Sequence, residues 1–143
     1  MNSEILSQLL EGNKRFREQQ KSPVSNKPKV CVVTCADSRL SPELIFDSKL
    51  GELFVIRTPG AFISEETLAS IHLGLKTFGI QEVIHLPHID CAALKGTRDP
   101  EEVKEHGQNM QKKIQDSLKE EALQANVSSW WYNPLEHEVH AEA

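Results

Sequence analysis

Three short apolar runs, rich in β-branched residues, constrain the fold of this chain more than any other feature. They occupy residues 30–34, 53–56 and 83–86. The first run shows no alternation of apolar with polar residues, which is typical of a strand that is covered on both faces. Because helical segments separate the runs, we expect parallel strands joined by right-handed crossovers. The sequence therefore predicts an α/β fold, as a three-layer α/β/α arrangement around a small, mainly parallel central sheet of about four strands.

Residues that typically begin or end helices lie between these runs. Ser41 followed by Pro42 is typical of a helix start, with serine as the cap and proline in the first turn. Ser64 can cap a second helix whose first turn is acidic, and Gly79 favours its end. The predicted helices cover residues 3–20, 41–46, 64–78 and 101–124.

The length of 143 residues predicts a single domain, residues 1–143. Residues 1–22 are expected to form an N-terminal helical arm, because Pro23 and Pro28 interrupt the chain before the first strand. Residues 126–143 are predicted to be a short, flexible tail.

The aromatic cluster Trp130-Trp131-Tyr132 lies in that tail and is interpreted as its anchor to the body or to a partner subunit. His137, Val139 and Ala141 alternate with acidic residues, so a short edge strand is the alternative for the end of the chain.

Composition excludes several classes of partner. The chain has 16 Lys and Arg residues against 21 Asp and Glu residues, which gives a formal net charge of −5 at pH 7. A protein that binds a phosphate backbone needs a basic surface instead. No apolar run approaches the roughly 18 residues of a membrane span, and the first residues lack the features of a signal peptide. We therefore expect a cytoplasmic protein that binds neither nucleic acid nor membranes.

The three cysteines direct attention to metal or thiol chemistry, because a disulfide framework is a poor explanation for an odd number without an export signal. Cys31 and Cys35 are four strand residues apart, which is roughly 13 Å at about 3.3 Å per residue and too far to share one metal ion. Cys31 is therefore interpreted as a buried core thiol.

Cys35 directly follows the first apolar run, and His88 and Cys91 come just after the third. In open parallel sheets, ligand sites form beyond the carboxyl ends of the strands. Two thiolates and one imidazole make a three-ligand zinc site that leaves a fourth position for water, which marks a catalytic zinc. Such a zinc lowers the pKa of its bound water from about 16 to about 7. The sequence thus predicts a Zn²⁺ ion held by Cys35, His88 and Cys91.

Asp37 and Arg39 lie two residues apart and project to the same side of an extended chain, where arginine can hold a carboxylate in a bidentate fork. So oriented, Asp37 could accept a hydrogen bond from the zinc-bound water. It could instead fill the fourth zinc position itself and close the site. The sequence permits both states.

The other histidines are not assigned to the site. His85 stands three residues before His88, a separation that places the two on opposite faces of a strand, and it is interpreted as a core or surface histidine. An unperturbed imidazole titrates near pH 6.5 and can relay protons, yet each of the remaining four is interpreted as incidental. They are His72, His106, His137 and His140.

Four motifs between about Leu10 and Leu94 resemble those of the β-class carbonic anhydrases, zinc enzymes that interconvert carbon dioxide and bicarbonate. They are Gly12-Asn-Lys-Arg-Phe16, Cys35-Ala-Asp-Ser-Arg39, Gly51-Glu-Leu-Phe-Val-Ile-Arg57 and His88-x-x-Cys91.

The resemblance implies that Cys35, His88 and Cys91 bind one zinc ion per subunit, and that Asp37 and Arg39 form the dyad that controls the zinc-bound water. It implies reversible hydration of carbon dioxide to bicarbonate by a zinc-bound hydroxide. It also implies a homodimer or a higher homo-oligomer, in which the helix over residues 3–20 embraces a partner subunit.

The sequence departs from the family pattern in three places. Arg57-Thr-Pro-Gly-Ala61 stands where Arg-Asn-Ala-Gly-Asn is usual, and Pro87 and Ala92 replace the glycines that usually flank His88-x-x-Cys91. The part after residue 124 is expected to be shorter than in the family. These departures suggest one alternative, a non-catalytic zinc-binding homologue. The resemblance itself leaves a second alternative, a hydrolase of carbonyl sulfide or carbon disulfide on the same zinc site.

Overall fold

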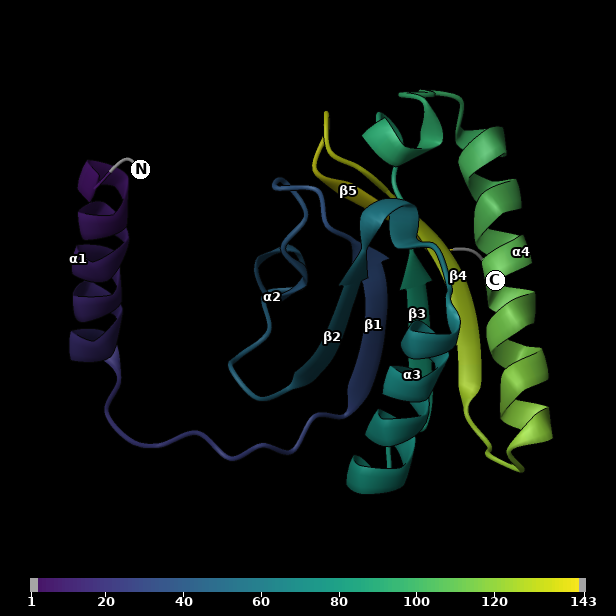
Figure 1. Ribbon diagram of the computed structural model, residues 1–143, viewed down its shortest axis with the longest axis horizontal. Coiled ribbons are helices and arrows are strands. Elements are labelled where there is room, and N and C mark those ends of the chain that lie inside the picture. Colours follow the sequence, from purple (N-terminus) through teal and green to yellow (C-terminus); the bar gives the residue numbers. More distant parts are fainter. Residues whose placement is uncertain (1–2, 142–143) are drawn as a thin grey trace.

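The computed structural model describes residues 3–141, whose strands form one sheet (Figure 1). The strand order is β2-β1-β3-β4-β5. The first four strands in this order are parallel to one another, and β5 is antiparallel to β4. The predicted α/β class with a mainly parallel sheet is therefore confirmed. The strands are β1 (Val30–Cys35), β2 (Leu53–Thr58), β3 (Glu82–Leu86), β4 (Asn126–Asn133) and β5 (Glu138–Ala141).

The three predicted strands are all present, and β1 lies between the other two. Every residue of β1 except Val30 is buried, which explains why its sequence lacks polar alternation. β2 runs further than predicted, to Thr58, because Thr58 is the register partner of Cys35 at the end of β1.

The sheet has five strands rather than about four, because residues 126–141 form β4 and β5 instead of the expected flexible tail. β4 pairs in parallel with β3, and β5 returns along β4 as the alternative edge strand. The polar residues of β4 concealed it in the sequence. One of them, Ser129, is nevertheless buried. It packs so closely against Gly107 that a Cβ added to this glycine would lie 2.5 Å from the Oγ of Ser129. Residues 142 and 143 of the expected tail lie outside the described residues.

Two helices, α3 (Glu65–Phe78) and α4 (Pro100–Glu120), cover one face of the sheet. As predicted, Ser64 caps α3 by accepting the N–H of Thr67, and Gly79 ends it in the left-handed conformation. This face holds the larger core. Its buried side chains include Cys31, Val33, Val83, Ile71, Leu75, Ile114 and Leu118.

α4 ends at Glu120, before the predicted residue 124. Ala122 adopts a positive φ of 53°, and the N–H of Leu123 donates to the carbonyl of Leu118 at 2.9 Å. This is a left-handed C-terminal turn, in which backbone geometry rather than side-chain pattern sets the end of the helix.

Within residues 3–141, the opposite face carries only one short helix, α2 (Pro42–Ile45), so the third layer of the predicted arrangement is thin. Leu40 and Phe46, which flank α2, pack with Val32 and Leu86 of the sheet. Ser41 occupies the predicted N-cap position, but its side chain makes no capping hydrogen bond. Several apolar side chains of this face stay partly exposed, among them Val30, Leu53, Ile84 and Trp130.

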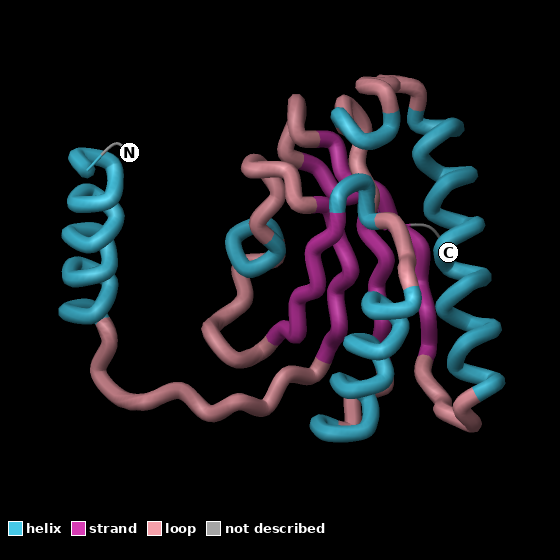
Figure 2. The backbone as a smooth tube through the Cα atoms, in the orientation of Figure 1, coloured by secondary structure: helices cyan, strands magenta, loops and turns pink. Residues whose placement is uncertain are grey.

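The predicted N-terminal arm is the helix α1 (Ser3–Gln19), which stands apart from the sheet at the end of an extended connection (Figures 1 and 2). None of its residues is buried, and Leu9 and Leu10 are 66% and 73% exposed. Among residues 3–141, no helix is long and apolar enough to cross a membrane.

Candidate metal centre

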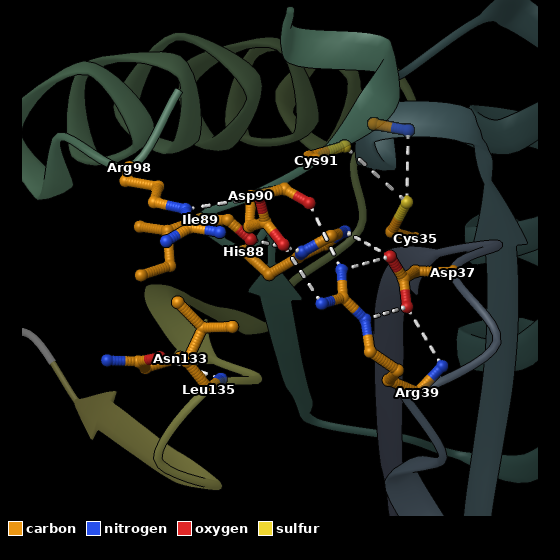
Figure 3. A network of polar contacts seen from close by, with 11 residues as sticks. Cys35, Asp37, Arg39, His88, Ile89, Asp90, Cys91, Arg98, Asn133 and Leu135 are labelled. Atoms are coloured by element: carbon orange, nitrogen blue, oxygen red, sulfur yellow. Dashed lines mark hydrogen bonds and ion pairs between the residues drawn. The ribbon is translucent and has the colours of Figure 1, made fainter. Parts of the chain in front are cut away.

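The three predicted ligands converge at the carboxyl end of the sheet (Figure 3). Cys35 is the last residue of β1, and His88 and Cys91 follow β3, its parallel neighbour. Their donor atoms all lie within 4.8 Å of one another, and the two sulfur atoms are 3.8 Å apart. All three residues are buried. No other cluster of this kind occurs among residues 3–141.

The imidazole of His88 is oriented by the backbone beside it. Its Nδ1 lies 2.7 Å from the carbonyl oxygen of Ile89, and because a carbonyl oxygen only accepts, Nδ1 carries the proton. Burial lowers the pKa of His88, which keeps the ring neutral. Nε2 therefore presents a lone pair, and this buried atom has no hydrogen-bond partner among the described residues. An imidazole held by its other nitrogen in this way is typical of a metal ligand.

The donor set fits zinc. Tetrahedral coordination with Zn–S bonds of about 2.3 Å places two sulfur ligands about 3.8 Å apart, which is the separation found between Cys35 and Cys91. Burial, followed by the nearby Cys35, raises the pKa of Cys91. Two neighbouring buried thiolates therefore need a cation between them, and soft sulfur ligands with one imidazole favour zinc.

Cys35 also receives a backbone hydrogen bond. The N–H of Gly60 donates to its Sγ at 3.3 Å, from the 3-10 turn Pro59–Ala61 that follows β2. Gly60 has a φ of 66°, and a Cβ at this position would lie 2.8 Å from the ring of Phe62. Sequence reasoning could not find this contact, because a main-chain donor leaves no side-chain signal.

Asp37 and Arg39 pair as predicted. Arg39 Nε donates to Oδ1 of Asp37 at 3.0 Å and Nη2 donates to Oδ2 at 2.8 Å, while the backbone N–H of Arg39 adds a bond of 2.8 Å to Oδ1. Hydrogen bonding from Arg39 lowers the pKa of Asp37 to about 2. Asp37 is therefore a carboxylate of fixed orientation at neutral pH.

The carboxylate of Asp37 lies beside the three donors without joining them. Its Oδ2 is 3.7 Å from His88 Nε2, and its side chain is 16% exposed, whereas that of His88 is 1% exposed. Arg39 and Tyr132 border a surface pocket of about 340 Å³. The Asp37–Arg39 pair thus lies between the buried donors and solvent.

Asp90 is a site residue that sequence reasoning missed. Its carboxylate accepts Arg39 Nη1 at 3.0 Å and Arg98 Nε at 3.3 Å, and its carbonyl accepts Arg39 Nη2 at 3.1 Å (Figure 3). The hydrogen bond from Arg39 lowers the pKa of Asp90. The signal was present in the sequence, because Asp90 stands inside the His88-x-x-Cys91 motif, where the two middle residues were treated only as spacing.

Two exclusions made from the sequence agree with the structure. Cys31 is fully buried in the core beneath α3 and α4, where burial raises its thiol pKa to about 12. His85 is likewise fully buried, inside β3. Neither residue belongs to the donor cluster, and the same holds for His72, His106, His137 and His140.

Comparison with known proteins identifies a matching family model and similar relatives. A family model described as carbonic anhydrase matches residues 30–141. "Carbonic anhydrase 2" of Mycobacterium tuberculosis is 36% identical over 98 residues, which cover 60% of this chain and 47% of that protein. The chain therefore spans about half the length of this curated relative.

Solved structures share the fold. Carbonic anhydrase from Streptococcus mutans matches with a TM-score of 0.81 at 19% identity, covering 95% of this chain and 96% of that one. The β-carbonic anhydrase CcaA matches with a TM-score of 0.79 at 23% identity, covering 94% of this chain and 93% of that one.

The family model covers most of the chain, from the start of β1 to the end of β5, and it includes all three members of the donor cluster. The fold found in the solved structures extends over nearly the whole chain. The chain therefore belongs to the β-class carbonic anhydrase family.

Proposed function

We propose that this protein is a zinc-dependent carbonic anhydrase that catalyses the reversible hydration of carbon dioxide to bicarbonate. One observation carries the proposal: in a member of this family, three buried donors converge beside an ionised Asp37–Arg39 pair. Cys35, His88 and Cys91 would hold one zinc ion per subunit and leave a fourth position open. Zinc, when bound, would supply a Lewis acid that makes water nucleophilic near neutral pH.

Asp37 would orient the reacting water. Each carboxylate oxygen has two acceptor positions, so Oδ2 keeps one free after accepting Arg39 Nη2. This oxygen is also the one nearest to His88 Nε2. With a pKa of about 2, Asp37 accepts hydrogen bonds but holds no proton of its own at neutral pH.

Arg39 would keep Asp37 out of the fourth ligand position. To reach that position, the carboxylate would have to break the bonds of 3.0 and 2.8 Å that it accepts from the guanidinium. Arg39 is itself tied to Asp90, so the guanidinium is held from two sides. Of the two states that the sequence permits, we therefore propose the open one.

The test is stopped-flow measurement of carbon dioxide hydration by zinc-loaded protein across pH. Cys35→Ser should lose zinc and activity together. Cys31→Ser is the matched control, since it removes a buried cysteine outside the cluster and should retain both. Activity that survives Cys35→Ser would contradict the site.

Two other outcomes would identify the alternatives. Sulfide release from carbonyl sulfide or carbon disulfide, without appreciable hydration of carbon dioxide, would assign the hydrolase reaction to this site. Zinc bound in full with no turnover of any of these substrates would identify a non-catalytic homologue.

We further propose a homo-oligomer in which α1 packs on a partner subunit. The exposed Leu9 and Leu10 give α1 an apolar side, and the thinly covered face of the sheet leaves Trp130 partly exposed. Light scattering after gel filtration should show the oligomer dissociating in Leu9→Glu. Leu73→Glu, at a residue of α3 that is 57% exposed, should leave the oligomer intact.

We also propose that the protein works in the cytoplasm. All three cysteines are free, and thiolate ligands persist where the compartment keeps thiols reduced. Fractionation of cells that express the full chain would test this location.

A further inference from the structure

The turn that donates a hydrogen bond to Cys35 has an unfavourable backbone conformation. Gly60 and Ala61 both have positive φ, at 66° and 55°, and Ala61 carries a Cβ that disfavours this region. Both residues are buried. Contacts from the surrounding structure must therefore hold this pair in place.

Two histidines from different elements make those contacts. His85 of β3 places Nε2 2.7 Å from the carbonyl oxygen of Ala61, and His106 of α4 places Nε2 2.8 Å from that of Gly60. A carbonyl only accepts, so each Nε2 is the donor. Both carbonyls of the strained pair are thus fixed by imidazole N–H groups.

Further contacts hold the same segment. The ring of Phe62 packs edge-on against His106, with centroids 4.6 Å apart. Thr58 Oγ1 donates to the carbonyl of Phe62 at 2.8 Å, which closes the turn between β2 and α3. Burial lowers the pKa of His85 to about 4, so its ring is neutral at pH 7 and Nε2 keeps the one proton.

From this geometry we propose that His85 and His106 are positioning residues for Cys35: by holding the carbonyls of Ala61 and Gly60, they aim the Gly60 N–H at the sulfur that would bind zinc. The inference rests on the proposed zinc site. A hydrogen bond to a ligand atom tunes the affinity and the electronic properties of the bound metal. Neither histidine touches the donor cluster, so both would act through the turn.

His106 provides the sharper test, because it is only partly buried. His106→Leu removes the donor, and His106→Gln can restore it, since the amide nitrogen of glutamine reaches about as far as Nε2. His72→Leu is the matched control, because the hydrogen bond of this histidine goes to Ser117 of α4 and not to a carbonyl of the turn. Thermal unfolding of each variant establishes that it is folded.

Two measurements that do not need turnover test whether His106 positions this N–H group. One is the zinc affinity in competition with a chromophoric chelator, and the other is the sulfur-to-metal charge-transfer band of the Co²⁺-loaded protein. His106→Leu should weaken zinc binding by about 10-fold and move the band to longer wavelength, because a sulfur without its N–H donor gives up electron density more easily. His106→Gln should largely restore both, and His72→Leu should change neither.

A folded His106→Leu with the affinity and the band of the wild-type protein would overturn the inference, as would equal changes in His72→Leu. A wild-type chain that binds neither Zn²⁺ nor Co²⁺ would overturn it together with the proposed function. Protein that binds zinc without hydrating carbon dioxide would overturn only the proposed function. His85→Leu and His85→Gln repeat the comparison at the buried position, and if His85→Leu does not fold, the His106 variants decide.

Discussion

His88 and Tyr132 lie side by side as a parallel β-bridge beyond the end of β3, although one precedes α4 in the chain and the other follows it. The N–H of Tyr132 donates to the carbonyl of Pro87 at 3.0 Å, and the N–H of Ile89 donates to the carbonyl of Tyr132 at 3.2 Å. β4 therefore holds the backbone on both sides of His88. This C-terminal strand is therefore part of the support of the candidate metal centre.

Deletion of residues 126–143 should abolish cooperative unfolding. A flexible tail would be dispensable, but β4 covers the edge of β3 and contributes Val127, Trp131 and Tyr132 to the buried core. Urea unfolding followed by circular dichroism provides the measurement. A shorter deletion, of residues 138–143, removes only the edge strand β5 and should leave a cooperative transition at lower urea concentration. An unchanged transition after the longer deletion would contradict the role of β4.

Asp90→Asn should lower kcat/KM by about 10-fold while the zinc content stays the same. The substitution removes the charge that faces Arg39 Nη1, and asparagine tolerates the φ of 58° at this position. Arg98→Gln is the control, because Arg98 is largely exposed and contacts Asp90 at 3.3 Å from the solvent side. Equal rates in Asp90→Asn and the wild-type protein would show that Asp37 alone fixes Arg39.

Gly60→Ala should destabilise the protein more than Gly79→Ala. The two glycines have nearly the same φ, 66° and 67°, so alanine at either position costs about 1–2 kcal/mol in backbone conformation. A Cβ at Gly79 meets nothing within 4 Å, whereas one at Gly60 meets the ring of Phe62 at 2.8 Å, which adds about 1–3 kcal/mol. Urea unfolding measures the difference, and weaker zinc binding should appear only in Gly60→Ala.

The metal-free protein should lose stability as the pH falls from 6.5 to 4, because of His85. The folded pKa of about 4 lies below the ordinary 6.5, so the unfolded chain binds the proton first and acid favours unfolding. The difference between these two pKa values corresponds to about 3 kcal/mol of folding stability, which is fully present above pH 6.5 and lost at pH 4. In His85→Gln this part of the dependence should disappear. Parallel curves of unfolding free energy against pH for the two proteins would contradict the assignment.

The sequence predicted the parts of the fold that depend on local pattern. The buried runs identified β1, β2 and β3, and Ser64 and Gly79 located both ends of α3. β4 was missed because its polar residue Ser129 is buried against Gly107 of α4, and burial by a distant element leaves no periodic signal in a short polar segment. The end of α4 was misplaced because a left-handed turn at Ala122 decides it.

For the site, residue types and their places after the strands were enough to predict which donors would come together. Cys35, His88 and Cys91 supply the donors, and the rule that ligand sites lie at the carboxyl ends of parallel strands predicted that they would meet. The contacts that support these donors could be seen only in the folded chain. The contacts of Gly60 with Cys35, of Tyr132 with the backbone around His88, and of His106 with Gly60 join residues far apart in the chain through main-chain groups. Main-chain donors and acceptors are the same for nearly every residue type, so the sequence carries no record of which of them will meet.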